Sequence, residues 1–100
     1  MKKVFISQPM VDKTDDEIKA ERNKAIENIK KETNDNDVEI IDSFFEGAPH
    51  DAKPLWFLGK SIQFLSNADV AYFIGDWKNY RGCKAENYLA KAYGIATIEE

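Results

Sequence analysis

Residues 67–77, NADVAYFIGDW, together with residues 81–86, RGCKAE, decide the fold of this chain. The first segment predicts a buried strand at residues 70–74 that ends in a polar loop, because Gly75 and Asp76 follow an apolar run. The second segment opens a helix with a glycine and places Glu86 one turn into it. Ligands of open α/β sheets bind outside the carboxyl ends of the strands, so we expect Glu86 to face such a crevice.

The rest of the chain continues this alternation of strands and helices. Apolar runs predict further strands at residues 4–7, 38–42 and 95–98. Thr14 and Glu17 form a capping box that begins a first helix, which ends near Thr33. A second helix begins around Lys53-Pro54, since proline suits the first turn, and its predicted buried stripe is Leu55, Leu58, Ile62 and Leu65. A third helix runs from about residue 82 to 93.

This order, β-α-β-α-β-α-β, predicts an α/β fold with a parallel sheet covered by helices on both faces. We expect one domain over residues 1–100, a flavodoxin-like three-layer sandwich with four strands in the order 2-1-3-4. The strand order then reverses between the first and third strands. The loops at residues 7–13 and 75–82, and in part the loop at 43–51, meet at that point.

Composition excludes several classes of function. The chain has 100 residues, 43% of them hydrophobic, and a net charge of −4. The negative charge argues against a partner that is a nucleic acid polymer or an anionic membrane. No apolar run approaches the ~20 residues that span a membrane. Cys83 is the only cysteine, which favours a reducing compartment, so we expect a cytoplasmic protein.

Three residues near the carboxyl end of the third predicted strand are candidates for chemistry. Glu86 is suited to attack an anomeric carbon as a nucleophile, although an acid in the first turns of a helix is also favoured by the helix dipole. Asp76 is placed to exchange a proton with a leaving base, or is an ordinary loop aspartate. Trp77 can stack on a planar ring, plug the loop or contact a second subunit.

Other residues at the same edge are candidates for binding a ligand. Gly82 allows close approach at a helix start, and Arg81 and Lys84 beside it either contact a phosphate or are solvated surface cations. Ser7 and Gln8 can hold a base or a sugar hydroxyl, in a loop that Pro9 stiffens. His50 and Cys83 lack metal-ligand spacing, so we expect no metal site. No phosphate loop, dinucleotide glycine motif or serine elbow is present.

The chain resembles the nucleoside 2-deoxyribosyltransferase-like superfamily, most closely a small branch found in bacteria and phages. The resemblance covers nearly the whole chain and is carried by residues 4–10, VFISQPM, by residues 66–70, SNADV, and by Gly82-x-x-x-Glu86. It implies that Glu86 is the nucleophile, and that the loop of Ser7 to Met10 and the Asp76-Trp77 loop hold the sugar and base. No metal or organic cofactor is implied, because a covalent intermediate replaces it.

The chain departs from the family pattern at two positions. Ser61 stands where family enzymes often carry an aspartate on the second helix, so we assign it to the ligand site without an acid's role. Lys84 stands where a second glycine is usual, and the resemblance implies that such a basic residue binds a 5′-phosphate.

We therefore expect a protein that binds a nucleoside or nucleotide and cleaves its N-glycosidic bond, or transfers its deoxyribosyl group, through Glu86. The alternative is a non-catalytic nucleotide-binding module, a sensor or scavenger. In a third hypothesis the chain is an interaction protein whose aromatic residues serve an oligomer surface. The second helix carries Trp56, Phe57 and Phe64 beyond its core stripe, which predicts a homodimer or higher homo-oligomer.

Overall fold

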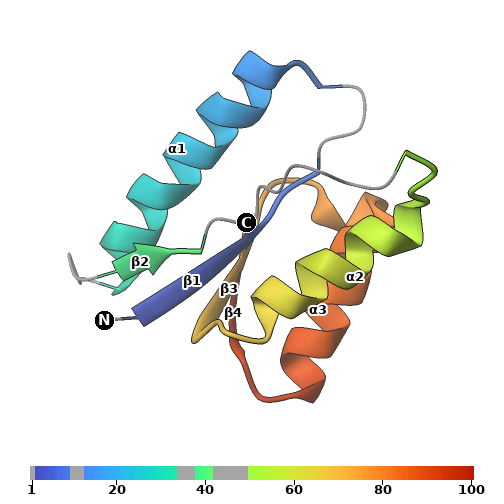
Figure 1. The fold of residues 1–100 in the computed structure, drawn as a ribbon. Helices are drawn as coiled ribbons and strands as arrows, with labels where there is room; N and C mark the ends of the chain where they lie inside the picture. The colour runs from blue at the N-terminus through green and yellow to red at the C-terminus, as the bar shows by residue number, and fades with distance from the viewer. Residues whose placement is uncertain (1, 10–12, 34–37, 42–49) are drawn as a thin grey trace.

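The fold is a four-stranded parallel sheet between two layers of helices (Figure 1). In this computed structural model residues 2–9, 13–33, 38–41 and 50–100 are described. The strands are β1 (Lys2–Ser7), β2 (Val38–Ile40), β3 (Val70–Phe73) and β4 (Ala96–Glu99), in the order β2-β1-β3-β4. This confirms the predicted flavodoxin-like strand order, and it places the carboxyl ends of β1 and β3 side by side.

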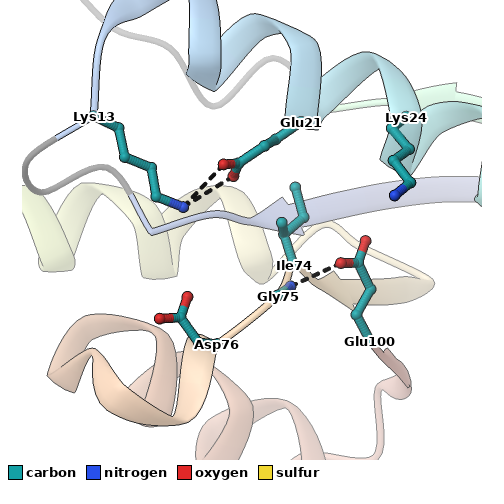
Figure 2. A pocket seen from close by; sticks show the side chains of 7 residues that line it. All are labelled: Lys13, Glu21, Lys24, Ile74, Gly75, Asp76 and Glu100. Carbon is teal, nitrogen blue, oxygen red and sulfur yellow. Dashed lines mark hydrogen bonds and ion pairs between the residues drawn. The ribbon is translucent and has the colours of Figure 1, made fainter.

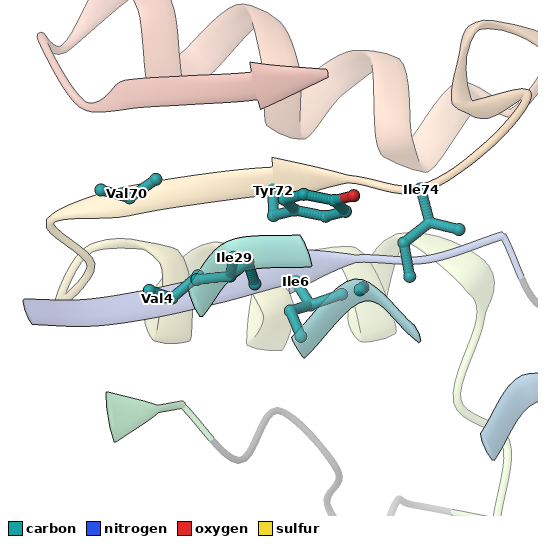
Figure 3. Packing of buried hydrophobic residues seen from close by; sticks show 7 residues of the cluster. Val4, Ile6, Ile29, Val70, Tyr72 and Ile74 are labelled. Atoms are coloured by element: carbon teal, nitrogen blue, oxygen red, sulfur yellow. The ribbon is translucent and has the colours of Figure 1, made fainter. Parts of the chain in front are cut away.

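Helix α1 (Asp15–Thr33) covers one face of the sheet, and α2 (Pro54–Leu65) and α3 (Arg81–Ala92) cover the other (Figure 1). Side chains of the two central strands alternate between these faces, because successive residues of a strand point in opposite directions. Val4 and Ile6 of β1 pack against Ile29 of α1, together with Val70, Ala25, Tyr72 and Ile74 (Figure 3). In the part of the chain that the structure describes, no helix is long and apolar enough to cross a membrane.

The opposite face of the sheet forms a second cluster beneath α2 and α3. Phe5 of β1 packs there with Phe73 of β3 and with Leu65, Ala71, Trp77, Cys83 and Ala90. Ser7 lies two residues after Phe5 on the same strand, so its side chain points to the same face. The alternation that builds the core therefore also directs the Ser7 hydroxyl toward α3.

The predicted buried stripe of α2 is wrong at its first member. Leu55 is 75% exposed, Leu58 and Ile62 are half-buried, and Leu65 is 3% exposed. The helical spacing of these residues is right, but burial increases along the helix. Only the carboxyl-terminal half of α2 packs closely on the sheet. The hydrophobic pattern of a single sequence does not reveal which turns of a helix extend beyond the sheet.

Smaller differences concern the ends of elements and the β3–α3 connection. The second strand was predicted to reach Asp42; it ends at Ile40, although the Ile41 N–H still donates to the Val4 carbonyl at 2.9 Å. Asp42 lies outside the described residues. A short 3-10 helix, η1 (Trp77–Asn79), precedes α3 and was not predicted. Gly94 follows α3 with a φ of +77°, as expected for a glycine that ends a helix.

The amino-terminal cap of α1 gives a first testable prediction. The Glu17 N–H donates to the Thr14 hydroxyl at 3.2 Å, as the capping box predicted. Thr14→Ala should lower the free energy of unfolding by about 1 kcal/mol, because one helix N–H group loses its partner. Urea denaturation measures this loss, and Thr14→Ser is the control because it keeps a capping hydroxyl. Equal losses in both variants would contradict the capping role.

Candidate functional site

Glu86 and Ser7 form a buried polar contact between α3 and the carboxyl end of β1. The Ser7 hydroxyl donates to Glu86 Oε1 at 2.9 Å, although the two residues are 79 positions apart in the sequence. Ser7 is 1% exposed and Glu86 is 7% exposed. The structure therefore brings together the predicted nucleophile and one predicted ligand-binding residue. They meet at the carboxyl end of the sheet, where a parallel α/β fold binds ligands.

The environment of Glu86 changes its acidity. Burial raises the pKa of the Glu86 carboxyl to about 7 from an ordinary value of 4.5, because a charged carboxylate loses its hydration in the protein. The hydrogen bond from Ser7 opposes this rise, since it stabilises the ionised form. The Glu86 carboxyl therefore titrates close to neutral pH, well above the range of an ordinary glutamate. Groups that titrate in this range are frequent at functional sites.

Cys83 lies one helical turn before Glu86, close to the Ser7–Glu86 contact. Its thiol is free and 5% exposed. Burial raises the pKa of the Cys83 thiol, the nearby Ser7 hydroxyl opposes this rise, and the negative charges of Glu86 and Asp76 raise the pKa further. The thiol therefore stays protonated at neutral pH, and it lies within electrostatic range of both candidate acids.

Asp76 is exposed and lines a hollow of about 290 Å³ at the carboxyl end of β3 (Figure 2). The Lys13 ammonium there pairs with Glu21 of α1 at 3.0 Å, and the Gly75 N–H donates to Glu100 at 2.8 Å. The lining residues are Lys13, Glu21, Lys24, Ile74, Gly75, Asp76 and Glu100. Neither Ser7 nor Glu86 lines this hollow, so the two candidate acids do not share it.

The charged groups around this hollow were not predicted from the sequence. Glu21 and Lys24 lie three residues apart on α1, which places them on one face of the helix. That spacing was the available signal. The spacing of Glu21 and Lys24 points to a site only once the strand order is known, because that order places α1 near the end of β3.

The loop after β1 contains a polar side chain with an unmet hydrogen-bonding requirement. Gln8 is 8% exposed, and its Nε2 donates to the Ile18 carbonyl at 2.6 Å. Its Oε1 is buried and has no hydrogen-bond partner among the residues that the structure describes. A buried acceptor of this kind requires a donor from water or from a ligand. Pro9 is buried beside it, and Met10 lies outside the described residues.

Trp77 belongs to the core. It is 6% exposed, and its ring lies 5.3 Å from that of Phe73, centroid to centroid. This placement fits the alternative in which Trp77 plugs the loop.

The remaining predicted site residues lie on α2 and α3. Ser61 is half-buried within α2. Arg81 and Lys84 are exposed in the first turn of α3, and Gly82 between them is half-buried. A Cβ atom at Gly82 would meet no protein atom within 4 Å, so packing does not require a glycine there.

Asp69 has a structural role at the start of β3. Its carboxylate accepts the Lys3 N–H at 2.8 Å, and its own N–H donates to the Lys3 carbonyl at 2.8 Å. These two bonds join Lys3, near the start of β1, to Asp69, which directly precedes β3, at the end of the sheet opposite to Ser7. The SNADV segment thus fixes the register that places Ser7 beside Phe73.

Within the described ranges, no three His, Cys, Asp or Glu side chains are placed to hold a metal ion. Comparison of the chain with protein-family models, with curated proteins and with solved structures finds no match.

Proposed function

We propose that this protein binds a nucleoside or nucleotide and cleaves its N-glycosidic bond, with Glu86 as the nucleophile. The observation that carries the proposal is the buried Glu86 carboxyl, held by Ser7 at the carboxyl end of the parallel sheet. A carboxylate in such a position serves glycosyl transfer, because it can form a covalent bond with an anomeric carbon. The resemblance of residues 4–10, 66–70 and 82–86 to the nucleoside 2-deoxyribosyltransferase-like superfamily supports the same chemistry.

The reaction has two steps. The ionised Glu86 attacks C1′ of the sugar, and the bond between C1′ and the base nitrogen breaks with its electron pair leaving on the base. Asp76, on the connection before α3, supplies a proton to the departing base. Water then attacks C1′, releases the Glu86 carboxylate and returns a proton to Asp76. A second base in place of water makes the protein a transferase.

Other residues near the carboxyl end of the sheet bind the ligand. Gln8 belongs to the loop after β1 that borders the ligand, and its Oε1 is buried there without a partner among the described residues. Arg81 and Lys84, exposed at the start of α3, contact a 5′-phosphate together with the helix N–H groups. Ser61 lies within α2 and offers a hydroxyl where an acid would otherwise orient the sugar.

The test is release of free base from a panel of deoxynucleosides and their monophosphates. We expect Glu86→Gln to reduce the rate by at least about 10³-fold, because the amide cannot form the glycosyl ester. Glu27→Gln is the matched control, since Glu27 is exposed on α1. Base release that survives in Glu86→Gln, or that is absent in the wild type with every substrate, contradicts the proposal.

A non-catalytic nucleotide-binding module is the second candidate. It is favoured by two observations: the pKa of Glu86 of about 7 leaves only part of the carboxyl ionised at neutral pH, and Asp76 opens on a hollow that Glu86 does not line. In this case titration calorimetry detects binding of a monophosphate without any turnover. Binding that is equal in the wild type and in Glu86→Gln then identifies the module.

Assembly into a homodimer through α2 belongs to the same proposal. Leu55 is 75% exposed and Phe57 is 42% exposed on this helix, so two copies can bury apolar surface by pairing it. Sedimentation velocity on the wild type and on Leu55→Glu tests the assembly. A monomeric wild type contradicts it.

A further inference from the structure

We infer that Ser7 is a positioning residue that holds Oε1 of Glu86 and leaves Oε2 as the oxygen that attacks the sugar. This inference rests on the proposed function. It changes the role of Ser7, which the sequence assigned to contact with the ligand.

Ser7 is a rigid donor. It is the last residue of β1, pairs with Phe73 of β3, and accepts the Ile74 N–H on its carbonyl at 3.1 Å. Its side chain is 1% exposed, so its hydroxyl does not exchange its partner for bulk water. The donor and the α3 carboxyl are thus fixed by two elements that pack together in the core.

The two oxygens of the Glu86 carboxyl differ in their surroundings. Oε1 accepts the hydrogen bond from Ser7. Among the described residues, Oε2 has no hydrogen-bond partner, and it is not one of the fully buried unpaired atoms, of which Gln8 Oε1 is the single case there. Oε2 is therefore the oxygen of the Glu86 carboxyl that the Ser7 contact leaves free to react.

The contact fits both steps of the reaction. As Oε2 forms its bond with C1′, the bond from C1′ to the base nitrogen breaks and negative charge leaves the carboxyl. When water later displaces the ester, the charge returns to a carboxylate whose Oε1 already has a donor in place. Ser7 keeps its own proton throughout, so no further acid or base is needed at this position.

Measurement of the Glu86 titration separates this inference from the proposed function, because it needs no substrate. Carboxyl ¹³C NMR follows Glu86 in the folded protein. Cys83 and Asp76 are the neighbouring titratable groups, and both remain in every variant. Ser7→Ala should make Glu86 a weaker acid by about tenfold, because the ionised form loses its donor. Ser7→Thr should keep the wild-type titration. Ser66→Ala is the matched control, since Ser66 is exposed.

An unchanged Glu86 titration in folded Ser7→Ala overturns the inference, whatever the activity. If base release is observed, Ser7→Ala should lower kcat by about tenfold and leave KM within about twofold, because the residue acts on Glu86 rather than on the ligand. A raised KM with unchanged kcat overturns positioning in favour of direct ligand contact. If the Glu86 titration shifts in Ser7→Ala but no substrate releases free base, the proposed function is contradicted and the Ser7 contact is still supported.

Discussion

Replacing Glu86 with glutamine should stabilise the folded protein by about 3 kcal/mol near pH 8 and by almost nothing near pH 4. The reason is the cost of burying an ionised carboxyl, which raises the pKa of Glu86 from 4.5 to about 7. Glutamine has nearly the same shape, stays neutral at every pH, and can still accept the Ser7 hydrogen bond through its amide oxygen. The variant therefore keeps the contact and removes the charge.

The pH window follows from the two states of the chain. The unfolded chain loses the Glu86 proton near pH 4.5, whereas the folded protein keeps it until about pH 7. Between these values the folded state binds more protons, so the stability that Glu86 contributes is complete below pH 4.5 and is lost as the pH rises through 7. Urea denaturation of both proteins at a series of pH values measures the difference, in which the other titrating groups cancel.

Glu99→Gln is the matched control because Glu99 shifts in the opposite direction. Hydrogen bonding to Lys91 lowers the pKa of the Glu99 carboxyl. At pH values above the ordinary carboxyl pKa, Glu99→Gln should therefore be less stable than the wild type. The loss should be small, because this ion pair is exposed. A difference between wild type and Glu86→Gln that is independent of pH would show that Glu86 is not the buried acid of the structure.

A stabilising effect of this size bears on the proposed function. If the denaturation experiment gives this value, packing and capping of α3 do not explain an acid at position 86. The helix dipole favours a negative charge near the start of α3, but a fully hydrated surface position would provide that benefit without the cost of burial. Such a result would support the proposed chemical role of Glu86 over a purely structural one.

The fold was predictable because several local signals agree. Apolar runs bounded by turn residues identified the strands, the capping residue Thr14 and the proline at residue 54 identified helix starts, and the strict alternation of elements required a parallel sheet. The extent of packing was not predictable, as the exposed Leu55 shows. Periodicity identifies the buried face of a helix. Whether its first turn extends beyond the sheet depends on where the sheet lies.

Only the Ser7–Glu86 part of the candidate site was predictable in its members, and its geometry was predictable only in part. Ser7 and Glu86 were expected at one edge, and the structure adds that the serine contacts the acid directly. The same side-chain alternation that faces Phe5 toward α3 contained this information, since Ser7 follows it by two residues. The core position of Trp77 depends on η1, a short turn without a distinctive sequence pattern.

Truncation of two leucines in α2 should have very different effects, although both changes are Leu→Ala in the same helix. Leu65→Ala should lower the free energy of unfolding by about 2–5 kcal/mol, because Leu65 is 3% exposed and its removal leaves a cavity beside Phe5 and Phe73. Leu55→Ala should change it by less than about 0.5 kcal/mol, because Leu55 is 75% exposed. Helix propensity does not distinguish the variants, since it changes equally in both.

Urea denaturation at one pH measures both variants, and the protein concentration should be varied about tenfold. If α2 pairs with a second copy of the chain, Leu55→Ala also loses stability, and this loss grows with protein concentration because the dimer is linked to folding. If the loss is absent at every concentration, Leu55 contacts only solvent. Equal losses at both positions and at all concentrations would instead mean that the first turn of α2 packs within the monomer, contrary to the exposed position that the structure gives Leu55.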